Sequence, residues 1–226
     1  MLLLLPAAAL AGGTGDIGIP ELEGAGFTQT QAQLIDRFMP ADIKQGLADW
    51  IDVIVWRNYI SALRFDPGGV SDSGRYMAIY YSSGVGNSAL QLYATEKGEW
   101  VLKDETRNVS IGGTLGIAAV DVDCDGKVEL AVYCVVSAAG YESVDLVKIV
   151  DNRLVTITPH EHGKWIRGRR LTLKNVDDDC ELEIEGYQDG NEKYDASIRL
   201  LYKLDRNAET YTLRAREDTK KHDQVE

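Results

Sequence analysis

Four carboxylates crowd into one short segment in the middle of the chain, Asp121-Val-Asp123-Cys-Asp125-Gly126-Lys-Val-Glu129. Alternate residues of a tightly curled loop point to the same side, so the acids at loop positions 1, 3, 5 and 9 converge. The glycine at position 6 allows the sharp turn, and the backbone carbonyl at position 7 adds an oxygen. Carboxylates this close repel one another unless a hard divalent cation, which takes about 6 to 8 oxygen ligands, lies between them. The segment therefore predicts a Ca²⁺ site.

Position 12 separates the two calcium-loop geometries that open with this pattern. An EF-hand requires a bidentate Glu at that position and a helix on each side. Position 12 here is Val132, and the flanking sequences, Ile-Ala-Ala-Val and Leu-Ala-Val-Tyr, are strand-like. The sequence therefore excludes an EF-hand and favours a calcium loop that connects two strands.

The wider segment, Ile117-Ala-Ala-Val-Asp-Val-Asp-Cys-Asp-Gly-Lys-Val-Glu-Leu-Ala-Val132, resembles the FG-GAP/VCBS repeat, the calcium-loop blade of integrin-α-type β-propellers and many secreted bacterial proteins. The resemblance implies a Ca²⁺ ion between the first two strands of a blade, in an extracellular binding or adhesion protein. Transferred by position, the ligands would be Asp121, Asp123, Asp125, Lys127 through its carbonyl, and Glu129. Cys124 departs from the small or polar residue usual in this family, and we expect its side chain to point outward.

A second loop, Asn175-Val-Asp177-Asp-Asp179-Cys180-Glu-Leu-Glu183, is similar to the same repeat in the same register. Its ligands would be Asn175, Asp177, Asp179, Glu181 through its carbonyl, and Glu183. Cys180 replaces the glycine at position 6, and a side chain in a left-handed turn costs about 1 kcal/mol. We therefore expect this second site to be weaker than the first, or empty.

The loops belong to a repeat. An earlier strand-to-loop boundary begins at Asp66, so that the three loops start at Asp66, Asp121 and Asn175, which lie 55 and then 54 positions apart. The first loop keeps Asp66, Asp72 and Gly74 but lacks alternating acids, so we expect it to hold no metal. Each interval contains four short strands, which is typical of propeller-like repeats.

The elements that must position these loops follow from periodicity. A capping box, Thr28-Gln-Thr-Gln31, predicts a helix after a Gly-rich stretch that we expect to be extended to about Gly26. A second helix begins near Pro40, with an apolar stripe at the helical period (Ile43, Leu47, Trp50, Ile51 and Ile54). From Tyr59 the period changes to two. A dozen strand-like runs follow, at 60–65, 76–82, 90–95, 100–103, 115–120, 128–136, 144–150, 154–158, 171–174, 182–187, 198–204 and 211–214.

The predicted fold is therefore mainly β: three propeller-type four-stranded antiparallel units behind a short helical N-terminal segment. Three units do not close an ordinary propeller ring, whose blades typically number about 4 to 8. An open stack, a partial propeller capped by the helices and a half completed by a second copy all remain open. The strand-like segment 52–56 is an alternative means of completing the last unit.

The boundaries follow the same changes in composition. Residues 1–11 form an apolar run ending in Ala9-Leu-Ala11, which is typical of a signal peptide and predicts a secreted or periplasmic protein. Residues 12–58 form the N-terminal extended and helical segment, 59–215 the three-repeat domain and 216–226 a charged tail. Gly13-Thr-Gly15-Asp-Ile-Gly18 matches a dinucleotide fingerprint, but Pro20 and later glycines interrupt the helix that such a site requires.

Composition excludes several classes of partner. The chain has 226 residues and a formal net charge of −12, which argues against nucleic acid because its binding depends on Lys and Arg. After the first dozen residues no apolar run approaches the roughly 18 residues of a membrane span. Cys124, Cys134 and Cys180 are an odd number, so at least one thiol is free or paired between chains, and Cys134 is expected in the core.

These features favour a calcium-binding module for binding or adhesion, with structural ions and an unknown extracellular protein or carbohydrate ligand. Self-association would be one way to complete the β architecture. The alternative is a secreted hydrolase or lyase acting on polysaccharide, using acidic residues or the His160/His162 pair, although no catalytic residue stands out. A crevice with paired carboxylates of perturbed titration outside the two loops would favour that enzyme. A structural spacer without a ligand is the third hypothesis.

Overall fold

The computed structural model describes residues 19–50, 56, 58–70, 73–83, 87–110, 112–136, 140–159, 166–177, 179–189 and 197–218. The predicted signal peptide, the dinucleotide-like glycines, the segment 51–55 and the His160/His162 pair lie outside these residues. In the part described, no helix has the length and apolar character to cross a membrane.

Three helices precede the strands: α1 (Ile19–Gly24), α2 (Gln29–Phe38) and α3 (Ala41–Trp50). The predicted capping box is confirmed, since the Gln31 amide donates to Thr28 Oγ1 and the Thr28 amide donates to Gln31 Oε1. The extended conformation predicted as far as Gly26 is wrong for 19–24. Pro20 suits the first turn of a helix, and Leu22, only 1% exposed, anchors α1 in the core.

The first sheet is antiparallel throughout and has the order β2-β1-β3-β4-β5. Its strands are β1 (Ile60–Asp66), β2 (Gly69–Val70), β3 (Tyr76–Ser82), β4 (Ser88–Glu96) and β5 (Glu99–Arg107). Because side chains alternate along a strand, Ile79 and Tyr81 of β3 pack against the helices, whereas Ala78 and Tyr80 face the second sheet.

The second sheet has the order β13-β12-β11-β10-β8-β7-β6, with β9 paired to β8. Its strands are β6 (Gly113–Val120), β7 (Glu129–Val135), β8 (Glu142–Val150), β9 (Arg153–Thr156), β10 (Arg167–Lys174), β11 (Glu183–Asp189), β12 (Ser197–Asp205) and β13 (Thr210–Asp218). Only the pairs Arg167–Ser143 and Gly168–Glu142 join β10 to β8, so the junction between these two groups of strands is short.

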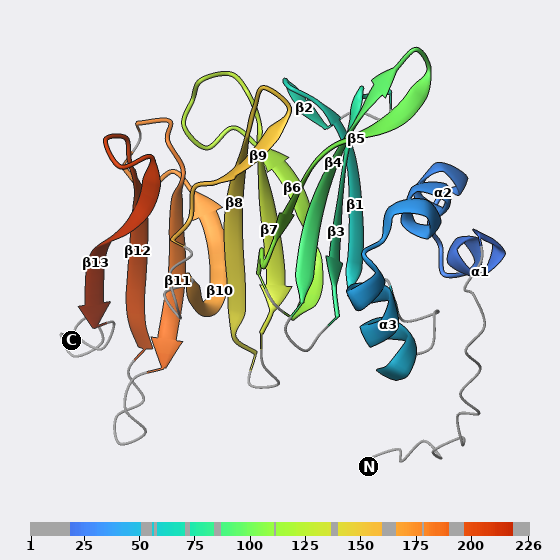
Figure 1. Ribbon diagram of the computed structural model, residues 1–226. Helices are drawn as coiled ribbons and strands as arrows, with labels where there is room; N and C mark the ends of the chain where they lie inside the picture. The colour runs from blue at the N-terminus through green and yellow to red at the C-terminus, as the bar shows by residue number, and fades with distance from the viewer. Residues whose placement is uncertain are drawn as a thin grey trace.

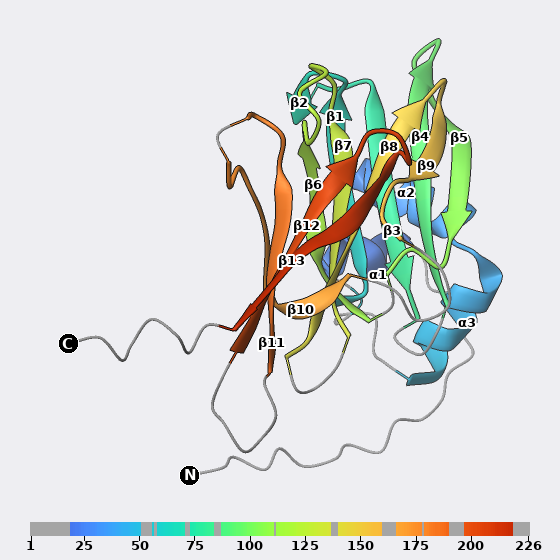
Figure 2. The same ribbon diagram turned by 90° about the vertical axis from the view of Figure 1, so that its left-hand side faces the viewer.

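Three hydrophobic clusters hold the layers together. The first lies between the helices and β1, β3 and β4, and the second lies between that sheet and β7 and β8. The third cluster includes Leu146 of β8, Ile184 of β11 and Tyr211 of β13. The helices lie beside β1, and β12 and β13 lie at the far end of the row of strands (Figure 1). In the view turned by 90°, β12 and β13 cross in front of the other strands (Figure 2).

The mainly β, antiparallel character predicted from the sequence is confirmed, and all twelve predicted strand runs overlap a strand. β2 is an addition to the prediction. Strands β6–β9 and β10–β13 belong to one sheet instead of two separate ones, because of the short β8–β10 junction. Along the described chain both sheets are open.

Candidate metal centre

The first acidic loop connects β6 to β7 and begins at Asp121, directly after β6. Asp121, Asp123 and Glu129 each offer a carboxylate oxygen, and these atoms lie within 4.8 Å of one another. Gly126 has φ 80°, so the left-handed turn expected at position 6 is present. Its amide donates to Asp121 Oδ2 at 2.9 Å, which closes the loop on itself.

Burial leaves this cluster short of partners. Asp121 Oδ1 is buried and has no hydrogen-bond partner, and Glu129 is 1% exposed. The Val122 amide donates to Glu129 Oε2 at 3.0 Å. The pKa of the Glu129 carboxyl is raised to about 7. Burial is the main cause and the negative charge of Asp123 adds to it, whereas the hydrogen bond from the Val122 amide lowers the pKa. A cation among these oxygens would compensate both the unpartnered oxygen and the buried charge.

Asp125, a further predicted ligand of the first loop, lies at the margin of the cluster. Asp125 is exposed and is not one of the three converging acids; its Oδ1 accepts a hydrogen bond from the Lys127 amide at 2.8 Å. Lysines neutralise part of this margin. Lys148 of β8 pairs with Asp123 and lies 3.9 Å from Asp125 Oδ2, and Lys127 Nζ lies 3.8 Å from the same oxygen.

The second acidic loop connects β10 to β11 and repeats this geometry. Asp177, Asp179 and Glu183 offer oxygens within 4.8 Å of one another. The Val176 amide donates to Glu183 Oε2 at 2.8 Å, which reproduces the contact between Val122 and Glu129. Cys180 has φ 70° and thus takes the left-handed conformation of Gly126, as its position predicted.

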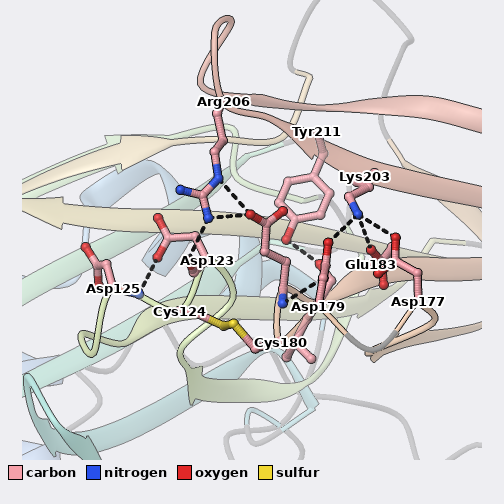
Figure 3. A network of polar contacts seen from close by, with 12 residues as sticks. Asp123, Cys124, Asp125, Asp177, Asp179, Cys180, Glu183, Lys203, Arg206 and Tyr211 are labelled. Atoms are coloured by element: carbon pink, nitrogen blue, oxygen red, sulfur yellow. Dashed lines mark hydrogen bonds and ion pairs between the residues drawn. A yellow bond between two sulfur atoms is a disulfide. The ribbon is translucent and has the colours of Figure 1, made fainter.

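Three of the five ligands predicted in the second loop are the acids of this cluster; the predictions for Asn175 and for the Glu181 carbonyl stay predictions. The Glu181 side chain accepts a hydrogen bond from Arg206 Nε at 2.7 Å. The carboxylates that do converge are occupied by a lysine. Lys203 Nζ lies 2.6 Å from Asp177 Oδ2 and 2.7 Å from Asp179 Oδ2 (Figure 3). The bond from Lys203 lowers the pKa of Asp179.

The two loops are joined to each other. A disulfide connects Cys124 to Cys180 across 56 positions of sequence, with the Cα atoms 6.2 Å apart. The Leu182 amide donates to the Val122 carbonyl at 2.9 Å. Arg206, which binds Glu181, also donates to the Asp123 carbonyl at 3.3 Å. The candidate centre is therefore one connected body made from two acidic loops (Figure 3).

The disulfide answers the question that the odd cysteine count left open. Cys124 is exposed, as predicted, and its partner is Cys180. Cys134 is the free thiol; it is fully buried and its sulfur donates to Tyr80 Oη at 3.2 Å. Its placement in the core is confirmed.

A groove of about 610 Å³ lies beside the first loop. Lys148 and Arg206 contribute charge to its lining, and Val150 and Val155, exposed by 48% and 44%, contribute apolar surface. An ion at Asp123 would change the pairing of Lys148 and hence the charge along this groove.

The first-repeat loop contributes no metal cluster among the residues that the structure describes, and Asp72 lies outside them. Asp66 accepts a hydrogen bond from the Arg75 amide at 3.0 Å, so its carboxylate stabilises the turn between β1 and β3. A comparison with models of known protein families gives no match, and a comparison with curated proteins gives none either.

Proposed function

We propose that the chain is a calcium-stabilised β-repeat module for binding or adhesion, in which the ion rigidifies the junction of β6 and β7. The observation that carries the proposal is the convergence of Asp121, Asp123 and Glu129 around a buried, unpartnered oxygen, Asp121 Oδ1. A loop built to lie in water would not bury such an oxygen without a partner.

The donor set favours a hard cation. All three converging side chains are carboxylates, which suit Ca²⁺, Mg²⁺ or Mn²⁺ and not the softer metals that Cys and His select. Ca²⁺ is our choice because Ca²⁺ tolerates irregular loops, whereas Mg²⁺ requires near-octahedral geometry. Asp121, Asp123 and Glu129 would hold the ion, with Asp125 and the Lys127 carbonyl as further ligands by resemblance to the FG-GAP/VCBS repeat.

The architecture supports the same proposal. Strands β1, β3, β4 and β5, then β6 to β9, then β10 to β13 are three successive groups of four, and each group pairs in chain order. We interpret these groups as propeller-type units. The short β8–β10 junction is the boundary between two of them, and both metal loops connect the first two strands of a group.

We place the module outside the cytoplasm. The Cys124–Cys180 disulfide is consistent with an oxidising compartment, where such bonds persist. The apolar run at 1–11 supports secretion or export to a periplasm. In this setting the partner is an extracellular protein or a carbohydrate, and self-association remains a second way to extend the sheets.

The polysaccharide hydrolase or lyase is the weaker candidate. Glu129, whose pKa burial raises, belongs to the metal loop and not to a separate crevice. The described acids that converge most closely are likewise those of the two loops. We therefore assign these carboxylates to ion binding instead of proton transfer.

The test is thermal unfolding in EDTA and in a Ca²⁺ titration. We expect Ca²⁺ to raise the melting temperature, since a ligand that binds only the folded state at about 100 times its Kd stabilises by about 2.7 kcal/mol. The D123A/D125A variant should lose this response. D66N, which alters an acid outside both clusters, is the matched control and should keep it. An unchanged melting temperature in the wild type would contradict the proposal.

A further inference from the structure

Both repeats place a lysine at the same register position beside their acidic loop. β7 and β8 are antiparallel and Leu130 pairs with Val147, so Glu129 and Lys148 occupy the next pair of opposite positions. In β11 and β12 the pairing of Ile184 with Tyr202 does the same for Glu183 and Lys203. The two lysines are therefore equivalent, and their different contacts distinguish the loops.

Lys203 lies at the centre of its cluster. Its Nζ is 2.6 Å from Asp177 Oδ2, 2.7 Å from Asp179 Oδ2 and 3.3 Å from Glu183 Oε1, so it contacts one oxygen of each converging acid. These are the three residues whose oxygens would otherwise surround a metal ion. The ammonium group thus stands where the ion would be held.

Lys148 lies at the edge of its cluster. Among the described charges it pairs with Asp123 and Asp125, and it forms no ion pair with Asp121 or Glu129. Among the described residues, each loop has one buried carboxylate oxygen without a hydrogen-bond partner, Asp121 Oδ1 in the first and Glu183 Oε1 in the second. Lys203 Nζ lies 3.3 Å from the Glu183 oxygen, whereas Lys148 does not pair with Asp121. The first loop thus retains a charge and an oxygen that its lysine does not satisfy.

The two loops also differ in burial, and this difference again favours an ion at the first loop. The Asp123 side chain is 12% exposed, whereas Asp177 and Asp179 are 50% and 41% exposed. Charges that are shielded from water attract a cation more strongly than charges that water screens. The first loop is therefore the better site for a divalent ion, whereas water and one ammonium group screen the carboxylates of the second loop.

We propose that Lys203 is a tethered cation that takes the place of the metal ion in the second loop, so that the linked pair of loops binds one Ca²⁺ ion, at the first loop. The second half of this statement rests on the proposed function. A side chain on β12 has a high effective concentration at the cluster, because its attachment to the fold replaces a bimolecular binding step. Ca²⁺ entering there would have to displace it, since two cations at such separations repel.

This arrangement gives the second loop a structural purpose. Lys203 keeps it folded whether or not Ca²⁺ is present, and the disulfide and the Leu182–Val122 hydrogen bond then connect a preformed loop to the first one. The second loop thereby buttresses the ion site without binding an ion.

The test is Ca²⁺ titration calorimetry of variants that separate the two loops. The wild type should bind one ion and D123A/D125A none. Adding K203Q to D123A/D125A should create binding of one ion, because the second cluster loses its ammonium group. K203R keeps the charge and should create no site in that background. K174Q, which removes a lysine paired with Glu185 on the same sheet, is the matched control and should also create none.

The outcomes distinguish the two proposals. If the wild type binds no Ca²⁺ but K203Q in the D123A/D125A background gains a site, the role of Lys203 stands and the proposed function fails. If K203Q creates no site in the D123A/D125A background, or if D123A/D125A alone still binds an ion, the inference about Lys203 is overturned. Should K203Q not fold, D177N/D179N decides: the wild-type stoichiometry must persist in it, and its loss would overturn the inference.

Discussion

Cys124 and Cys180 form a disulfide between two acidic loops that belong to different groups of strands. Both residues have left-handed backbone conformations, with φ values of 59° and 70°, and the Leu182–Val122 hydrogen bond lies beside them. The bond therefore fixes the loops relative to each other in addition to closing a long segment of chain. Its energetic role is open to direct measurement.

Replacing both cysteines, in C124S/C180S, should lower the free energy of unfolding by about 4 kcal/mol, as the chain-entropy model gives for a closed loop of this size. Urea unfolding without reductant measures the difference. The double variant avoids leaving a single reactive thiol, and the wild type with reductant is its control. A loss well under about 1 kcal/mol in both would show that the hydrogen bonds alone hold the loops together.

The Cys134 thiol should be unreactive in the native state. It is fully buried, and burial raises its pKa to about 12, so hardly any thiolate exists at pH 8. Mass spectrometry after alkylation should find no label on native protein and one label after unfolding without reductant. Reduction should expose two more. Rapid labelling of native protein at Cys134 would contradict the placement of this residue.

We expect the first loop to need glycine at position 126 because of the left-handed backbone conformation, and not because a side chain would clash there. Gly126 has φ 80°, and a Cβ built there meets nothing within 4 Å. G126A should therefore cost about 1 kcal/mol through the left-handed turn and weaken the Ca²⁺ response in the melting experiment. G24A, at a glycine with equal space and no positive φ, is the control. Equal stability of G126A and the wild type would show that the loop does not depend on this turn.

Stability at acidic pH should depend on Glu185. Its side chain is 6% exposed and pairs with Lys174 and Arg199. Burial alone would raise its pKa, but the bonds from these two cations outweigh burial and lower the pKa below its usual value of 4.5. A lowered folded-state pKa contributes stability that is present above pH 4.5 and is lost as the pH falls through the folded value.

We therefore expect E185Q to be less stable than the wild type at pH 7 by about 2 kcal/mol, because charged hydrogen bonds are lost. The difference should narrow as the pH falls below 4.5. Urea unfolding at several pH values in EDTA measures it. A difference that stays constant down to pH 3 would show that Glu185 does not titrate with folding.

Much of the fold could be predicted because its signals are local. Strand β3 was predicted with the same bounds, since Tyr76 to Ser82 is an apolar run between turn residues. Helix α1 was missed because it is only six residues long and depends on the burial of Leu22. The short contact between β8 and β10 could not be predicted, since such pairing depends on distant parts of the chain.

The candidate site likewise has features that local sequence predicts and features that depend on distant parts of the chain. The spacing of Asp121, Asp123 and Glu129 predicted their convergence. The contacts of Lys203 were missed because they arise from the register of β11 and β12, which the sequence does not display. In retrospect, a lysine on the third strand of both groups is a signal. The Cys124–Cys180 pairing was left open since three cysteines do not define their own connectivity.

The central claim is that the first loop holds an ion among Asp121, Asp123 and Glu129. Anomalous scattering from crystals grown with Ca²⁺ tests it most directly, because it locates the metal independently of the refined protein. We expect one peak at the first loop and only the Lys203 ammonium group at the second. Full data with no peak beside Asp121, and with its side chain turned toward water, would contradict the account.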